Sequence, residues 1–187
     1  MSASIKRERD GVVVLTLGST EVRVVRNAFG DLLALFDTHQ RDGGPVPEIA
    51  PGVLDPFGAP ASGEAPTDPA LARLLPDAYA ADPGAAAEYR RFTEGDLLAA
   101  KRANAGVVLA GLAEAERSGH VRLDGETVHI WLIAINDVRL TLGTRLEIEE
   151  DYEALIDQLE PDDPRLPGFA LYEWLTALQE TLVAHAA

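Results

Sequence analysis

The chain has 187 residues, 47% of them hydrophobic, which suits one compact domain that needs no disulfide or metal to hold its core. It carries no cysteine, which excludes disulfides, thiolate metal sites and cysteine nucleophiles and fits a reducing compartment. The N-terminus has no apolar signal region, and no apolar run approaches the roughly 20 residues that cross a bilayer. We therefore expect a cytoplasmic protein without a membrane segment.

The charge is strongly acidic, with 16 Lys and Arg against 31 Asp and Glu, a net charge of −15. Because most DNA affinity comes from neutralising phosphates with basic side chains, this balance argues against direct DNA binding unless the few basic residues cluster. A basic protein partner is easier to accommodate, although solubility alone also accounts for the charge.

The first elements are a β-hairpin and a helix. Residues 4–9 and 12–17 predict two strands around Asp10-Gly11, a dipeptide typical of a two-residue type I′ turn. Apolar residues at helical spacing then predict a helix over about 21–37, although Val22, Val24 and Val25 leave a third strand possible at its start. Residues 42–69 are rich in Pro and Gly, which predicts a long mobile loop or insertion, either a spacer or a binding arm.

Helices dominate the rest of the chain. Asp82-Pro83 is typical of a helix start, and Thr93 with Asp96 resembles a capping pair that begins another helix over about 94–117. Residues 121–123 can be a strand with Asp124-Gly125 as its turn, or Asp124 can cap the next helix. We favour a long helix over about 126–145, with strands only at the N-terminus.

The C-terminal part combines an acidic segment and a last helix. Residues 147–163 contain nine acidic residues and no Lys or Arg, and we expect an amphipathic helix whose acids are a solvated face or a docking surface for a basic partner. A leucine stripe from Leu171 to Leu182 predicts the last helix. The predicted fold is mainly α: a single-domain helical bundle over residues 1–187, around a central buried helix, with an N-terminal β-hairpin.

No catalytic signature is visible. The chain has no P-loop, no dinucleotide-binding glycine pattern, no nucleophile elbow and no paired-histidine zinc motif. His120 and His129 could approach one another across a turn, but their spacing is a weak metal signal. We therefore expect no catalytic residues, no metal and no cofactor.

The most informative segment is 131–148, WLIAINDVRLTLGTRLEI, which is apolar on nearly every side and so typical of a buried helix. Asp137 and Arg139 are two residues apart and cannot pair along a helix, so we expect Arg139 to reach Glu88, Glu94 or Asp96. A glycine within a helix usually marks the close approach of another backbone. The polar set is a structural clamp or, alternatively, a small-ligand, enzyme or partner pocket: Asn136, Asp137, Arg139, Gly143 and Arg145.

Four further polar residues are candidates for contact with a partner: Arg90, Arg91, Lys101 and Asn104. If these and the basic residues of 131–148 cluster on the surface, they could touch DNA or an acidic partner; otherwise they are internal clamps. The sequence leaves the oligomeric state open.

Two blocks carry a resemblance to a known family. Residues 75–112 and 131–148, the second with the order N-D-x-R-L-x-L-G-x-R-L, resemble the DUF2017 family of actinobacteria, and the resemblance spans nearly the whole chain. Its members are similar to an oxidative-stress transcriptional regulator. The resemblance implies a non-enzymatic regulator that contacts the transcription machinery, such as a sigma factor.

The same resemblance implies an alternative role as an accessory or adaptor factor for ClpS and Clp proteolysis, because family genes commonly lie near the gene for ClpS. This chain departs from a thiol-based redox sensor, since Met1 is its only sulfur-containing residue. Any oxidant sensing would therefore lie in a partner.

Overall fold

The computed structural model describes residues 3–42, 63–79, 81–150 and 152–186. The elements in chain order are β1 (Ala3–Arg7), β2 (Val13–Leu17), α1 (Ser19–Asp42), α2 (Pro69–Leu74), α3 (Pro83–Ser118), β3 (His120–Leu123), α4 (Gly125–Arg145), α5 (Tyr152–Ile156) and α6 (Leu166–Ala186). The prediction of a mainly α fold is confirmed.

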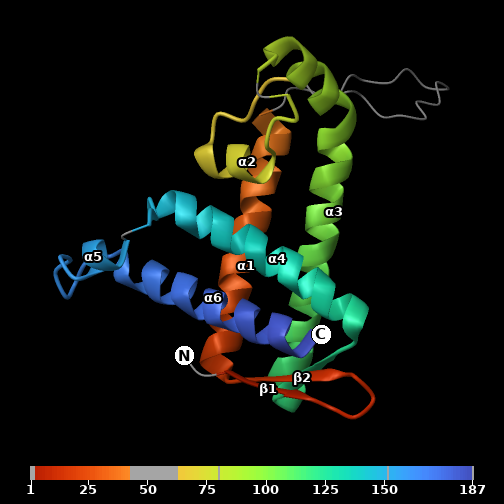
Figure 1. Cartoon of the computed structure of the whole chain (residues 1–187), viewed down its shortest axis with the longest axis vertical. Coiled ribbons are helices and arrows are strands. Elements are labelled where there is room, and N and C mark those ends of the chain that lie inside the picture. Colours follow the sequence, from red (N-terminus) through yellow and green to blue (C-terminus); the bar gives the residue numbers. More distant parts are fainter. Residues whose placement is uncertain (1–2, 43–62, 80, 151, 187) are drawn as a thin grey trace.

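The helices form two layers, shown in Figure 1. The long helices α1 and α3 run side by side in opposite directions, and α4 and α6 cross them as a second antiparallel pair. The small sheet closes one end of the layers, and α2 lies toward the other. Helix α4 contacts α6, α3, α2 and α1 and buries Val128, Trp131, Ala134, Ile135 and Val138. It is therefore the central buried helix that its apolar sequence predicts.

The hairpin is confirmed, but its turn is not the two-residue type. β1 and β2 pair with Arg7 opposite Val13, and the Gly11 N–H donates to the Glu8 carbonyl at 3.1 Å. Gly11 has φ 86°, so it takes the left-handed position that ends a three-residue loop. Glycine adopts that conformation without a Cβ clash, which is why the turn tolerates the extra residue.

The sheet has a third strand that corrects the expectation of strands only at the N-terminus. β3 pairs antiparallel with β2, with Val121 opposite Leu15, and Asp124 then caps α4 by accepting from the Thr127 N–H at 2.8 Å. Both readings of residues 121–125 are thus partly right, because a four-residue strand leads directly into the cap.

Helix α3 is unbroken over 36 residues, so the expected break near Thr93 is wrong. Asp82 caps the helix by accepting from the Gly84 and Ala85 N–H groups, both at 3.0 Å. The Thr93 hydroxyl instead donates to the Tyr89 carbonyl of the preceding turn at 2.9 Å, as threonine does inside helices. Gly119, with φ 80°, ends the helix.

Two other segments differ from expectation. α1 begins at Ser19, so no third strand precedes it, and α2 falls at the end of the Pro-rich stretch, where no helix was expected. Residues 43–62 of the predicted loop lie outside the described residues. The acidic segment forms only the five-residue α5, none of whose residues is buried. Tyr152, Leu155 and Ile156 are half-buried, and Tyr152 stacks on the buried Phe169 ring with centroids 6.4 Å apart, so the expected apolar side is present over a shorter helix.

One hydrophobic core joins the sheet to the helices. It includes Leu15 of β2, Phe29 and Phe36 of α1, Leu112 of α3 and the predicted leucine stripe of α6 from Leu171 to Leu182. In the described part of the chain, no helix has an apolar stretch long enough to cross a membrane.

Candidate functional site

Helix α4 carries polar groups on two opposite sides. Residues two positions apart on a helix are rotated by about 200°, so Asp137 and Arg139 face different neighbours. Asp137 faces α3, where the Lys101 ammonium donates to its Oδ1 at 2.7 Å. Its other oxygen, Oδ2, is buried without a hydrogen-bond partner. Burial raises the pKa of the Asp137 carboxyl, while the hydrogen bond and charge of Lys101 act in the opposite direction.

Arg139 faces α6, so the expectation of a carboxylate partner on α3 is wrong. Its Nε donates to Thr176 Oγ1 at 3.0 Å and its Nη1 to Gln179 Oε1 at 2.5 Å. The guanidinium also lies over the Tyr172 ring, 5.2 Å from the ring centroid. These three neutral groups hold the guanidinium in place, but none of them carries a charge that neutralises it.

A cavity of about 520 Å³ opens beside this side of α4. Asn136, Arg139 and Gly143 line it, together with Tyr172 of α6 and Arg73 of α2, and the carboxylates of Glu147 and Glu149 lie at the same cavity. Asp137 is not among the lining residues, because it faces α3. The structure therefore brings three residues of the predicted polar set to one cavity, and the choice between clamp and pocket stays a prediction.

The two remaining residues of the set have other surroundings. A Cβ added at Gly143 would lie 3.6 Å from Tyr172 Cε2, an ordinary contact, so the expected close approach of another backbone is not found. Arg145 lies half exposed at the end of α4 and pairs with Asp68, the cap of α2, at 2.5 Å. This ion pair ties the end of α4 to α2.

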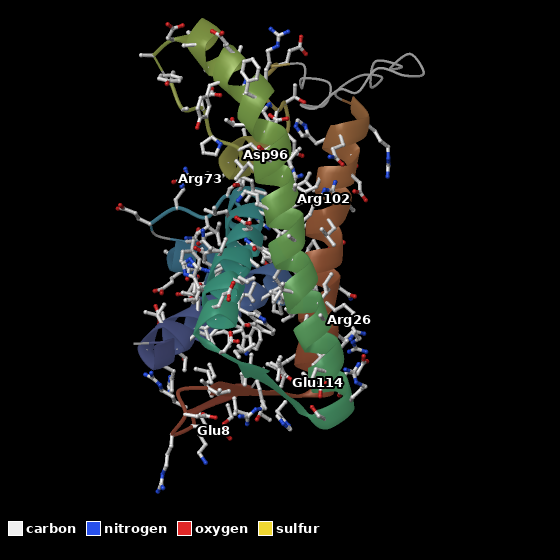
Figure 2. The ribbon with its side chains drawn as sticks, turned by 90° about the vertical axis from the view of Figure 1, so that its right-hand side faces the viewer. Glu8, Arg26, Arg73, Asp96, Arg102 and Glu114 are labelled. Atoms are coloured by element: carbon white, nitrogen blue, oxygen red, sulfur yellow. The ribbon has the colours of Figure 1, made fainter. Side chains whose placement is uncertain are left out.

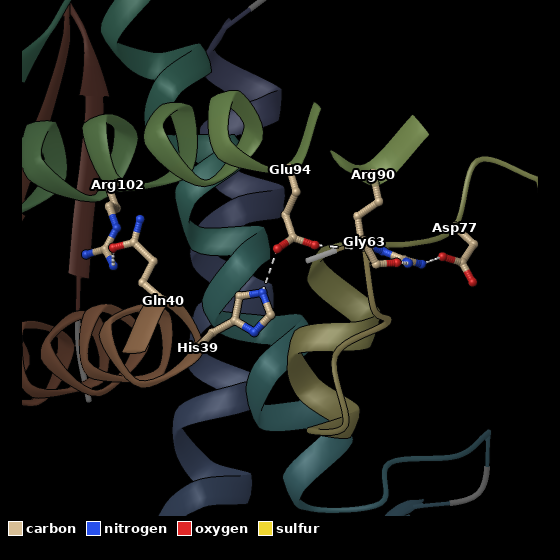
Figure 3. A network of polar contacts seen from close by, with 7 residues as sticks. All are labelled: His39, Gln40, Gly63, Asp77, Arg90, Glu94 and Arg102. Carbon is tan, nitrogen blue, oxygen red and sulfur yellow. Dashed lines mark hydrogen bonds and ion pairs between the residues drawn. The ribbon is translucent and has the colours of Figure 1, made fainter. Parts of the chain in front are cut away.

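A second polar network joins α1, α3 and the segments on either side of α2, as Figure 3 shows. His39 Nε2 on α1 lies 2.7 Å from Glu94 Oε1 on α3, and Glu94 Oε2 lies 3.7 Å from Arg90 Nε. Arg90 also donates to the Gly63 carbonyl at 2.7 Å and forms an ion pair with Asp77. Arg90 and Glu94 are each only 8% exposed, so these contacts fasten helices and loops internally.

The candidate interaction residues on α3 do not form one surface. Arg90 and Lys101 are directed inward to the partners just described, Asn104 is half-buried and Arg91 is exposed. The contact role of these residues stays a prediction, and Arg91 has the most accessible side chain of the four.

Exposed apolar side chains occur on the first half of α3 and on the segment before it, and the sequence patterns above do not single them out. We call this set of side chains the α3 apolar face: Tyr79, Tyr89, Phe92 and Leu97. Phe92 is 73% exposed, and Tyr79 packs edge-on against Tyr89 with ring centroids 5.8 Å apart. The available signal was the helical spacing of Tyr89 and Phe92 within a segment predicted to be helical.

Three acidic residues and one exposed basic residue, Arg91, lie near the α3 apolar face in the chain. Asp82, Glu88 and Asp96 are all exposed next to it in the chain, and Figure 2 shows Asp96 on the outer side of α3. The described residues contain no group of three or more His, Asp or Glu side chains that could hold a metal ion.

The fold and its contacts define a mainly α protein whose buried polar groups connect helices to one another. The family model described as "Domain of unknown function (DUF2017)" matches residues 1–186, and the chain belongs to this family. No solved structure matches it.

Named relatives place this family among regulators. The chain is 32% identical over 176 residues to "Putative oxidative stress regulator AosR" of Mycobacterium leprae, covering 87% of this chain and 77% of the relative. It is 31% identical over 183 residues to "Oxidative stress regulator AosR" of Mycobacterium bovis and of Mycobacterium tuberculosis, covering 90% of this chain and 79% of each relative. These names support a regulatory role at the level of the family.

Proposed function

We propose that this protein is a non-enzymatic regulator that acts by contact with a protein of the transcription machinery, such as a sigma factor. The observation that carries the proposal is the α3 apolar face with the acidic residues near it in the chain. Aromatic side chains dominate the binding energy of many protein interfaces, and an exposed apolar patch commonly marks one. The regulator names of the relatives support the same reading.

The negative charge of the chain indicates what kind of partner surface would be complementary to it. With a net charge of −15, and with Asp82, Glu88 and Asp96 beside the apolar face, the complementary surface is apolar with a basic rim. Long-range attraction between such surfaces speeds association. DNA carries the same sign of charge as this protein, so it fits the surface poorly.

The test is affinity purification from the native host, with and without oxidant, followed by mass spectrometry. We expect the wild-type protein to recover a sigma factor or another transcription component, and the Tyr89→Ser/Phe92→Ser variant to lose it. Val183→Ser is the matched control, because Val183 is a 55% exposed apolar residue on α6. Recovery of the same partner by the double variant would contradict the proposal.

Two other outcomes separate the alternatives. Recovery of ClpS or a Clp ATPase in place of a transcription component would support the adaptor role. A salt-dependent gel shift with promoter DNA that disappears in Arg91→Ala would favour direct DNA contact. Arg91 is the informative residue for this test, because Arg90 is buried and its loss would disturb the fold.

The cavity beside α4 favours a second candidate function, the binding of a small anion as an effector. Arg139 lines the cavity with only neutral hydrogen-bond partners, and Arg73 also lines it. Glu147 and Glu149 line the same cavity, so the anionic group has to bind next to the arginines. We expect small carboxylates or inorganic phosphate to raise the melting temperature of the wild type but not of Arg73→Ala. Equal shifts in both proteins, or none in either, would remove this candidate.

A further inference from the structure

The three-stranded sheet has an open edge at β3. β3 is the last strand in the order β1-β2-β3, and within the described residues no strand pairs with its other edge. The Leu17 N–H donates to the Gly119 carbonyl at 3.4 Å, and this bond shows which residues of β3 form main-chain hydrogen bonds with β2. Hydrogen-bonded and non-hydrogen-bonded residue pairs alternate along an antiparallel ladder. The main-chain groups of Val121 and Leu123 therefore bond to β2, and those of Arg122 face the open edge.

The open edge presents the main-chain groups of one residue. His120 would also face this edge, but the Ser118 hydroxyl donates to its carbonyl at 2.7 Å. For the Arg122 N–H and C=O, the described part of the chain supplies no partner on that side. The Arg122 side chain is held away by Glu8 at 2.8 Å and Asp10 at 3.7 Å.

A cavity of about 390 Å³ runs along this edge. All four residues of β3 line it, although His120 and Arg122 are exposed and Val121 and Leu123 are buried. Alternate residues of a strand point to opposite faces, so a cavity that touches both kinds lies along the edge of the strand. Residues of α3 and α4 form its other walls, and Figure 2 shows Glu114 at the C-terminal end of α3 near the sheet.

Trp131 of α4 forms part of the cavity wall and carries a buried, unpaired donor. The residue is 1% exposed, and its indole Nε1 has no hydrogen-bond partner among the described residues. A buried donor without an acceptor costs about 1–3 kcal/mol. The adjoining edge of the indole lies against Gly111, where a Cβ would come within 2.7 Å of Trp131 Cζ2. The N–H itself has no contact with the open space, so Trp131 contributes the packed wall of the cavity and its signals report on what binds there.

We propose that the cavity binds an extended peptide segment of a partner protein, which adds a strand to the open edge of β3. A peptide backbone supplies the acceptor for Arg122 N–H and the donor for Arg122 C=O side by side, as strand addition requires. Val107, Val121 and Trp131 receive an apolar side chain of the segment. Glu114 at the cavity is already paired with Arg117, so the net charge of −15 is what favours flanking basic residues.

The charge also argues against a second copy of this chain as the occupant, because two chains of net charge −15 repel each other. The proposed site lies at the opposite end of α3 from the α3 apolar face. It therefore stands or falls independently of the proposed contact with the transcription machinery.

The test uses the full chain and a synthetic peptide with the repeat Lys-Val-Lys-Val, capped at both ends. We expect it to shift the amide signal of Arg122 and the indole N–H signal of Trp131 in nuclear magnetic resonance spectra. In a Trp174→Phe background, Trp131 is the remaining tryptophan and its fluorescence gives the affinity. A Glu-Val-Glu-Val peptide and a Lys-Val peptide with N-methylated backbone are the controls, and both are expected to bind at least about tenfold more weakly.

Two variants of one residue separate the main chain from the side chain. Arg122→Pro removes the N–H at the open edge, where proline is tolerated, and we expect roughly tenfold weaker binding. Arg122→Ala keeps the N–H and is expected to bind within about threefold of wild type. If Arg122→Pro does not fold, as judged by circular dichroism, the N-methylated peptide still tests the hydrogen bonds.

Several results would overturn the proposal. These are equal binding of the native and N-methylated peptides, signal shifts confined to other regions, or no response to the basic peptide. Concentration-dependent dimerisation that shifts the same β3 signals would show that a second copy occupies the edge instead.

Discussion

At the scale of single residues, the surroundings of a side chain decide its role more than its chemical type does. Arg90 and Arg91 are neighbours in the sequence with the same guanidinium group. Successive residues of a helix are rotated by about 100° around its axis, so Arg90 points into the buried polar network while Arg91 points to solvent. The buried arginine holds Gly63, Asp77 and Glu94, whereas the exposed one is available to solvent and partners.

This difference gives a stability prediction for the two adjacent arginines. We expect Arg90→Ala to lower the free energy of unfolding by about 3 kcal/mol, because it leaves the buried Glu94 without its cation and the Gly63 carbonyl without its donor. Arg91→Ala is expected to change it by less than about 0.5 kcal/mol. Urea denaturation of both variants measures the difference, and equal losses would contradict the internal role of Arg90.

The pair of Lys101 and Asp137 gives a pH prediction. Burial raises the folded-state pKa of Asp137 above its ordinary value of 3.8. The folded protein therefore binds this proton more tightly than the unfolded chain does. The stability gained from this proton is full below about pH 3.8 and is lost as the pH rises through the folded-state pKa.

We therefore expect wild type to lose stability relative to Asp137→Asn as the pH rises from about 4 toward 8, since the variant cannot titrate at this position. Urea unfolding of both proteins across this range measures the difference in unfolding free energy. A difference that grows in favour of wild type would mean that Lys101 outweighs burial at this carboxyl.

At the scale of elements, local sequence signals located most helices but not every boundary. The apolar run of 131–148 predicts α4 because a long segment without a polar side has to be buried. The capping pattern at Thr93 and Asp96 misleads, because the same residue types also occur inside helices where Thr93 bonds to Tyr89. β3 is hard to predict because its four residues are short for a strand and run directly into a helix cap.

The partners of the polar residues on α4 could not be predicted from local patterns. Thr176 and Gln179 lie 37 and 40 residues beyond Arg139 in the chain. The helical period shows only that Arg139 and Asp137 face different ways, not which neighbouring helix each one meets. The choice depends on how α4 is rotated in the bundle, which the packing of Trp131 and the other buried side chains determines.

Two glycines of α3 test the packing between elements. Gly111 contacts Trp131 so closely that a Cβ would lie 2.7 Å from Cζ2 and 3.2 Å from Val121 Cγ2, whereas no atom lies within 4 Å of a Cβ at Gly106. We expect Gly106→Ala to raise the free energy of unfolding by up to about 1 kcal/mol through helix propensity. Gly111→Ala is expected to lower it by about 1–3 kcal/mol through overpacking.

Thermal or urea unfolding of the two glycine variants measures these opposite effects in a single helix. Equal gains in both variants would show that Trp131 can move aside at little cost. In that case the wall between α3 and α4 would be more adaptable than the contacts indicate.

At the scale of the whole molecule, the net charge of −15 opposes compactness through repulsion among acidic groups. The ion pair of Arg26 and Glu116 between α1 and α3 illustrates the compensation available, but it is exposed, and exposed pairs contribute little. The buried apolar cluster therefore has to carry the stability of the fold.

This balance predicts that added sodium chloride stabilises the protein. Raising the salt from about 20 to 200 mM shortens the screening length and weakens the repulsion. We expect the melting temperature to rise by about 2–4 °C, which corresponds to about 1 kcal/mol for a chain of this size. Calorimetry at fixed pH measures the change. A fall in melting temperature would show that attractive ion pairs outweigh the net repulsion.

The continuity of α3 sets the distance between the two surfaces proposed for contact. Phe92 of the apolar face and Gly111 of the cavity wall lie on one uninterrupted helix, and at the helical rise they are about 29 Å apart. Tight packing of α1 and α4 against the middle of the helix resists bending between them. If both proposed surfaces are occupied at once, this rigid helix fixes the distance and the relative orientation of the two bound partners.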